Sequence, residues 1–78
     1  MRDLSQTMEE IKLLNQFNLE SRESGIKVHA QHASDAALAA AERLFAKGLT
    51  DRGDGGYLTE RGLEAALHAQ AVLRLLSE

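Results

Sequence analysis

The 78-residue chain contains no cysteine, no proline and no tryptophan, and each absence excludes a class of structure. Without cysteine, no disulfide or thiolate metal site can compensate for a small core. The absence of cysteine agrees with a reducing compartment but does not require one. Without proline, and with alanine-rich periodic segments, the composition indicates helices rather than disorder.

Aromatic residues are also scarce, being limited to Phe17, Phe45 and Tyr57. We therefore expect no base-stacking platform of the kind that binds single-stranded nucleic acid. The net charge of −3 weighs against a strongly nucleic-acid-binding surface, because phosphate contacts need clustered Lys and Arg. A local basic patch could still oppose that net charge.

Long apolar runs are missing as well, so no transmembrane helix is expected. The first six residues lack the apolar core of a signal peptide, and we expect a cytoplasmic protein without a membrane partner. A chain of this length forms a single domain, 1–78, and buries only about 60% of its unfolded surface. Dimerisation would be one way to bury more.

The most specific local pattern lies in residues 43–63. Gly48 follows an apolar helical run and suits the left-handed position just past a helix end, with Lys47 as the C-cap. Residues 51–56 are rich in Gly and Asp, which form tight turns, and the flanking residues Leu49 and Leu58 can pair as short strands. Thr59 is a good N-cap for a following helix.

Apolar residues at spacings of three and four predict a first helix from about Leu4 or Met8 to about Arg22. Two capping boxes compete for its start, namely Asp3 with Gln6 and Thr7 with Glu10. Gly25 is its expected stop. Residues 26–29 alternate apolar and polar, which predicts either a short strand beside the hairpin or an extended connector.

A second helix is expected to begin near Ser34 or Asp35, and a third to run from Thr59 to Leu76. The third helix is apolar over more than one stripe. Its second apolar face either packs between the other helices or meets a partner chain, and the candidate partner-interface residues are Ala71, Val72 and Leu75.

The fold class expected from these elements is mainly α, with three helices, a short β-hairpin and a third short strand as an option. The predicted core combines the apolar stripes of the helices with one hairpin residue: Leu4, Met8, Ile11, Leu14, Phe17, Leu38, Ala41, Leu44, Phe45, Leu58, Leu63, Leu67 and Leu73.

The steps Lys47-Gly48-Leu49 and Tyr57-Leu58-Thr59-Glu60-Arg61-Gly62 resemble the second half of winged-helix domains, over about residues 36–76. The resemblance implies an abbreviated winged helix with a recognition helix, a β-wing and a final helix. It departs from that fold because residues 25–33 are too few for the usual intervening helix. It implies DNA binding and transcription regulation, and the candidate phosphate contacts are Arg43, Lys47, Arg52 and Arg61.

Over its whole length the chain also resembles a small family of bacterial proteins of about this size, known mainly from gammaproteobacteria. The residues that carry the likeness are Gly25-Ile26-Lys27-Val28-His29, the segment 43–49, Gly55-Gly56-Tyr57-Leu58-Thr59 and His68-Ala69-Gln70. That family has no established activity, so the resemblance implies a compartment and a size but no mechanism.

No set of residues predicts catalysis or a cofactor. His29, His32 and His68 with Asp35 are the only candidates for a metal site, and their spacing in a segment expected to be extended does not favour one. We therefore predict no metal, no cofactor and no enzyme activity. Two hypotheses remain: nucleic-acid binding like that of a winged helix, or a non-enzymatic protein–protein interaction module or homodimer.

Overall fold

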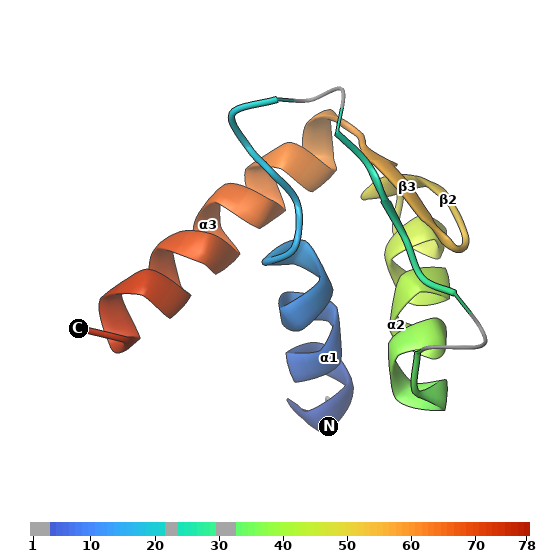
Figure 1. Ribbon diagram of the computed structural model, residues 1–78, viewed down its shortest axis with the longest axis horizontal. Helices are drawn as coiled ribbons and strands as arrows, with labels where there is room; N and C mark the ends of the chain where they lie inside the picture. Colours follow the sequence, from blue (N-terminus) through green and yellow to red (C-terminus); the bar gives the residue numbers. More distant parts are fainter. Residues whose placement is uncertain (1–3, 22–23, 30–32) are drawn as a thin grey trace.

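The chain folds as three helices and a small antiparallel sheet, which confirms the mainly α fold class with a short hairpin (Figure 1). The computed structural model describes residues 4–21, 24–29 and 33–78. The elements are α1 (Leu4–Leu14), β1 (Ile26–Lys27), α2 (Asp35–Ala46), β2 (Thr50–Arg52), β3 (Gly55–Leu58) and α3 (Glu60–Leu76). Three residues named above, Asp3, Arg22 and His32, lie outside the described residues.

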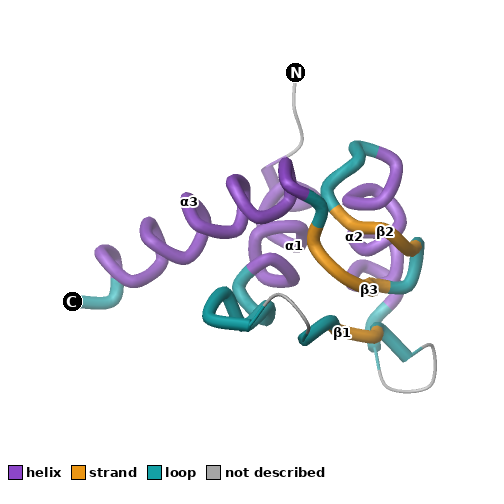
Figure 2. The backbone as a smooth tube through the Cα atoms, turned by 90° about the horizontal axis from the view of Figure 1, so that it is seen from above, coloured by secondary structure: helices purple, strands orange, loops and turns teal. Residues whose placement is uncertain are grey.

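Helix α3 extends away from the rest of the molecule toward its C-terminal end. Its N-terminal end lies beside the sheet, while its C-terminal half extends away from α1 and α2 (Figures 1 and 2). The whole described part of the chain has a radius of gyration of 11.8 Å. The last turns of α3 are therefore packed on one side at most.

The first helix ends at Leu14, well before the expected end. The Nε2 atom of Gln70 on α3 donates hydrogen bonds to the carbonyl oxygens of Leu14, at 3.1 Å, and Phe17, at 2.8 Å. The Oδ1 atom of Asn18 accepts from the backbone N–H of Glu20 at 2.9 Å, which forms a local turn. A side chain from another helix thus satisfies carbonyls that a longer helix would have bonded itself.

The ends of α2 follow the sequence prediction. The Oγ atom of Ser34 accepts from the N–H of Ala37 at 3.1 Å, so Ser34 is the N-cap. At the other end Lys47 is the C-cap and Gly48 has φ of 78°. The N–H of Leu49 donates to Leu44 O at 2.9 Å, which completes a Schellman motif.

The three strands form one sheet in the order β1-β3-β2, with both pairs antiparallel. Ile26 pairs with Gly56, so the segment 26–29 does contain a strand beside the hairpin. Leu58 pairs with Thr50 instead of Leu49, so the hairpin begins one residue later than expected. The Thr59 hydroxyl then accepts from Gly62 N–H at 3.1 Å and donates to Gly48 O at 2.6 Å, tying the start of α3 to the end of α2.

The core is small and lies where α1, α2 and the start of α3 meet the sheet. Its buried apolar residues are Leu13, Leu14, Phe17, Val28, Ala40, Ala41, Leu44 and Ala66. The core prediction was right for Leu14, Phe17, Ala41 and Leu44, and Ile11, Leu38, Leu58, Leu63 and Leu73 are half-buried. It was wrong for four residues that are exposed: Leu4, Met8, Phe45 and Leu67.

The four errors fall at three places in the fold. Leu4 and Met8 lie in the first half of α1, where α1 and α3 have diverged (Figure 1), and Leu67 lies on α3 but does not line the groove between α3 and α1. The ring of Phe45 lies beside the hairpin turn, within 3.9 Å of the position that a β-carbon on Gly53 would take. Periodicity identified an apolar face in each helix, but no neighbouring element buries these four positions.

Candidate protein–protein interface

Two of the four predicted phosphate-contact residues, Arg43 and Lys47, pair with an acidic side chain of α1. The Nε atom of Arg43 lies 3.2 Å from Glu10 Oε2, and its Nη2 atom donates to Gln6 O at 3.1 Å. Lys47 Nζ also forms an ion pair with Glu10, whose residue surface is only 7% exposed. These cations neutralise a buried carboxylate and join α2 to α1.

The other two predicted contacts, Arg52 and Arg61, are exposed. Arg52 ends β2, and Arg61 lies in the first turn of α3. Neither forms an ion pair with any other described residue. The candidate set is thus divided between two cations that pair with Glu10 at the C-terminal end of α2 and two exposed side chains on the hairpin and α3.

The predicted partner-interface residues lie on the C-terminal half of α3, which extends from the body. Val72 is 54% exposed and Leu75 is 60% exposed, while Ala71 is half-buried. Leu76, which the sequence interpretation did not include, is 78% exposed. Large apolar side chains with this exposure on one helix form a patch that water contacts unfavourably.

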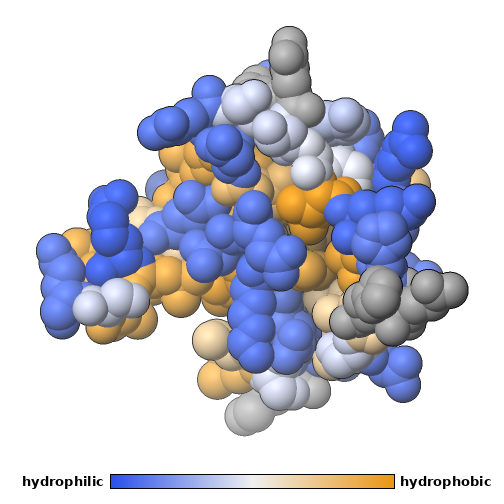
Figure 3. All heavy atoms as spheres, viewed as in Figure 1, coloured by the Kyte–Doolittle hydropathy of each residue, from blue (hydrophilic) through white to orange (hydrophobic). Residues whose placement is uncertain are grey.

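This patch continues into a groove of about 350 Å³ between α1 and α3. Its walls are apolar except for one histidine, and the lining residues are Met8, Ile11 and Leu14 from α1 and Ala65, His68, Ala69, Val72, Leu73 and Leu76 from α3. Figure 3 shows apolar atoms along the C-terminal half of α3, on the side that faces α1. We call the groove together with Leu75 the α1/α3 apolar surface.

Gln70 joins the two helices that form this groove. Its hydrogen bonds to the carbonyls of Leu14, the last residue of α1, and Phe17 connect the end of α1 to the middle of α3. From this point the helices diverge toward the start of α1 and the end of α3 (Figure 1). The groove is therefore a wedge that opens where Met8 and Leu76 lie.

The α1 half of the groove was missed because its residues were assigned to the core. The sequence showed an apolar excess only on α3, and nothing in it showed that the stripe of α1 stays uncovered. His68 lines the groove and His29 is exposed on the segment after β1, so the two described histidines lie on different elements. Within residues 4–21, 24–29 and 33–78, no cluster of three or more His, Cys, Asp or Glu is placed to hold a metal ion.

None of the described helices combines the length and the apolarity needed to cross a bilayer. Comparison with curated proteins gave no match, and comparison with solved structures gave none either. A family model does match, and it covers residues 1–77. The chain therefore belongs to DUF5669, a family of unknown function.

Proposed function

We propose that this protein is a non-enzymatic protein–protein interaction module that acts as a homodimer through its α1/α3 apolar surface. The observation that carries the proposal is the continuity between the apolar groove and the exposed side chains at the end of α3. A groove with walls this apolar selects an apolar occupant. A charged occupant would find almost no polar group in the groove with which to pair.

A second copy of this chain is the occupant that fits best. The end of α3 presents Val72, Leu75 and Leu76 as an exposed apolar ridge, and Val72 and Leu76 of this ridge also line one wall of the wedge. In a twofold dimer the ridge of each copy enters the groove of the other, so one surface supplies both halves of the contact.

The size of the core supports the same proposal. Among its eight buried apolar residues three are alanines, and Leu44 is the only large side chain that is fully buried within the described part of the chain. Full burial of one Leu or Val side chain contributes about 1.5–3 kcal/mol. Covering the ridge would thus add a contribution comparable to a large part of the stability of a small domain.

The test measures the mass in solution by light scattering for the parent chain and two matched variants. Val72→Glu places a charge in the groove of both copies, and we expect the dimer dissociation constant to rise about a hundredfold or more. Leu67→Glu is the control, since Leu67 is 53% exposed on the same helix but lies about 140° around it from Val72. Circular dichroism checks that both variants stay folded.

The result that contradicts the proposal is a parent chain that stays monomeric at millimolar concentration, or equal masses for the two variants. Leu75→Glu extends the test to the edge of the groove, and it should also produce a folded monomer. If Leu75→Glu keeps the mass of the parent dimer while Val72→Glu does not, the contact lies within the groove alone.

One structural observation supports the alternative hypothesis of nucleic-acid binding. The strand order β1-β3-β2, with the hairpin placed between two helices, agrees with the winged-helix resemblance. With Arg43 and Lys47 paired to Glu10, its phosphate contacts would be Arg52 and Arg61. Arg52→Glu should then weaken binding of duplex DNA and flatten its salt dependence, and an unchanged affinity removes the hairpin from this hypothesis.

A further inference from the structure

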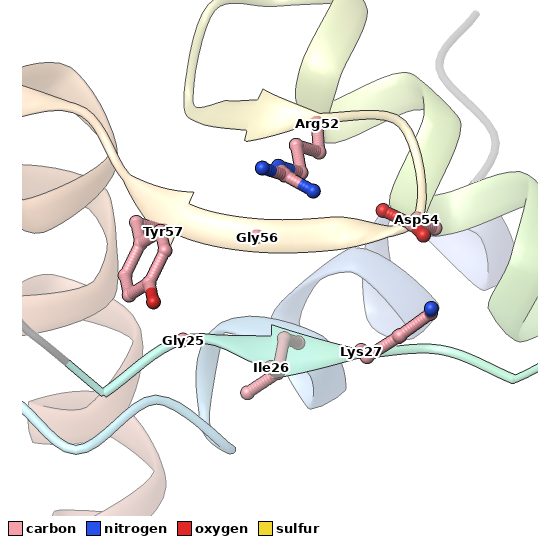
Figure 4. Close-up of a pocket in the computed structure, with 7 residues that line it drawn as sticks. All are labelled: Gly25, Ile26, Lys27, Arg52, Asp54, Gly56 and Tyr57. Carbon is pink, nitrogen blue, oxygen red and sulfur yellow. The ribbon is translucent and has the colours of Figure 1, made fainter.

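The exposed side of the sheet carries a second hollow, which the dimer proposal does not use. It has a volume of about 320 Å³ and draws its lining from all three strands and the residues beside them: Gly25, Ile26, Lys27, Arg52, Asp54, Gly56 and Tyr57. Figure 4 shows Arg52 extending toward Gly56, and the Tyr57 ring over the Gly25 end of β1. The hollow is therefore polar and charged, whereas the α1/α3 groove is apolar.

Two glycines make the floor of this hollow. Gly56 has φ of 73°, a conformation that other residues rarely adopt, and a β-carbon there would collide with the side chain of Asp51. A β-carbon on Gly25 would lie 2.5 Å from Gly56 O and 3.1 Å from Cδ1 of Tyr57. Because both positions lack side chains, bare backbone is left between the surrounding side chains.

The walls supply two cations and one aromatic ring. Lys27 and Arg52 come from the two strands that flank β3, and neither pairs with an acidic side chain among the described residues. Tyr57 is 45% exposed, and its backbone N–H is held by Asp51 Oδ1 at 2.8 Å. The backbone that carries the ring is therefore fixed while part of the ring remains open to a ligand.

We propose that this hollow binds a nucleoside monophosphate. Its phosphate would lie between Lys27 and Arg52, and its base would stack on Tyr57 above the glycine floor. A volume of about 320 Å³ is at the small end of the range for ligand pockets, about 300–1,000 Å³, so it has room for one nucleotide.

Two features select the monophosphate. The small volume leaves room for one phosphate beside the base, and the carboxylate of Asp54 on the rim would repel the further phosphates of a triphosphate. Tyr57 is the only aromatic residue among the described residues that line the hollow, so one base can stack there, and a strand of several bases would find no platform.

The experiment titrates the full chain with adenosine monophosphate at low salt, followed by calorimetry and by backbone amide shifts. Adenosine, inorganic phosphate, adenosine triphosphate and a short oligoadenylate are titrated in parallel. We expect the monophosphate to bind more tightly than any of the other four, with the largest shifts at Lys27, Arg52 and Gly56. No saturable binding of the monophosphate, or tighter binding of the oligoadenylate, would overturn the assignment.

Variants separate the two halves of the site. Tyr57→Leu and Arg52→Gln should each weaken binding of the monophosphate by about tenfold, because each removes one recognition element. Lys12→Gln and Arg61→Gln remove cations that do not line the hollow, and binding should be unchanged. Equal losses in all four variants would mean diffuse attraction to positive charge, and no loss for Tyr57→Leu would mean a simple anion site, so either result contradicts the proposal.

Discussion

The guanidinium of Arg43 lies 3.2 Å from the carboxylate of Glu10, across the packed faces of α2 and α1. The two residues are 33 positions apart in the sequence. The Glu10 side chain is 9% exposed and that of Arg43 is 27% exposed, so the pair lies at the edge of the core. The cation that resembles a nucleic-acid contact in the sequence is therefore paired within the fold.

Arg43→Met should lower the free energy of unfolding by about 1.5–3 kcal/mol, because it leaves the buried Glu10 with one partner fewer. The measurement is urea denaturation at neutral pH. Lys12→Met is the control, since Lys12 pairs with Glu9 at 3.2 Å but its side chain is 65% exposed. Its loss should be below about 0.5 kcal/mol. Equal losses in the two variants would mean that Arg43 has no special role.

Gln70→Leu should lower the stability by about 1–3 kcal/mol, because it leaves the carbonyls of Leu14 and Phe17 without their side-chain donor. The end of α1 should also loosen, and faster hydrogen exchange of the amides in residues 11–17 would report it. Gln16→Leu, at an exposed position just after α1, is the matched control. If Gln70→Leu leaves both stability and exchange unchanged, Gln70 does not set the end of α1.

Substitution by alanine should lower the stability by different amounts at two glycines. Gly48→Ala meets no neighbouring atom within 4 Å, so its cost is only that of a positive φ, about 1–2 kcal/mol. Gly62→Ala places a methyl group against Leu49 O and close to Leu58, so α3 must move away from the hairpin. Thermal unfolding should show a larger loss for Gly62→Ala, and the reverse order would contradict the close packing of α3 against residue 49.

The local signals in the sequence predicted the ends of α2 and the start of α3. Ser34, Gly48 and Thr59 act on backbone groups that are near in sequence, so their residue types alone were informative. The strand at Ile26–Lys27 could also be predicted, because the alternation of apolar and polar residues after Gly25 identified an extended segment.

The end of α1 and the ion pairing of Arg43 with Glu10 could not be predicted in the same way. Both depend on partners that are distant in sequence, since Gln70 and Leu14 are 56 positions apart. Only part of the groove could be predicted from the sequence. An apolar stripe shows which face of a helix avoids water, but it does not show whether another element covers that face. Met8 has the same periodic signature as Leu14 on the same helix, and only its place in the fold distinguishes the two.

The most direct test of the dimer proposal is the mass of the parent chain in solution, compared with that of Val72→Glu. The account predicts a concentration-dependent mass that approaches twice the 8.5 kDa of one chain, and a folded 8.5 kDa monomer for the variant. A parent chain that stays at 8.5 kDa up to millimolar concentration would contradict the account, because the α1/α3 apolar surface would then remain open to water without its proposed partner.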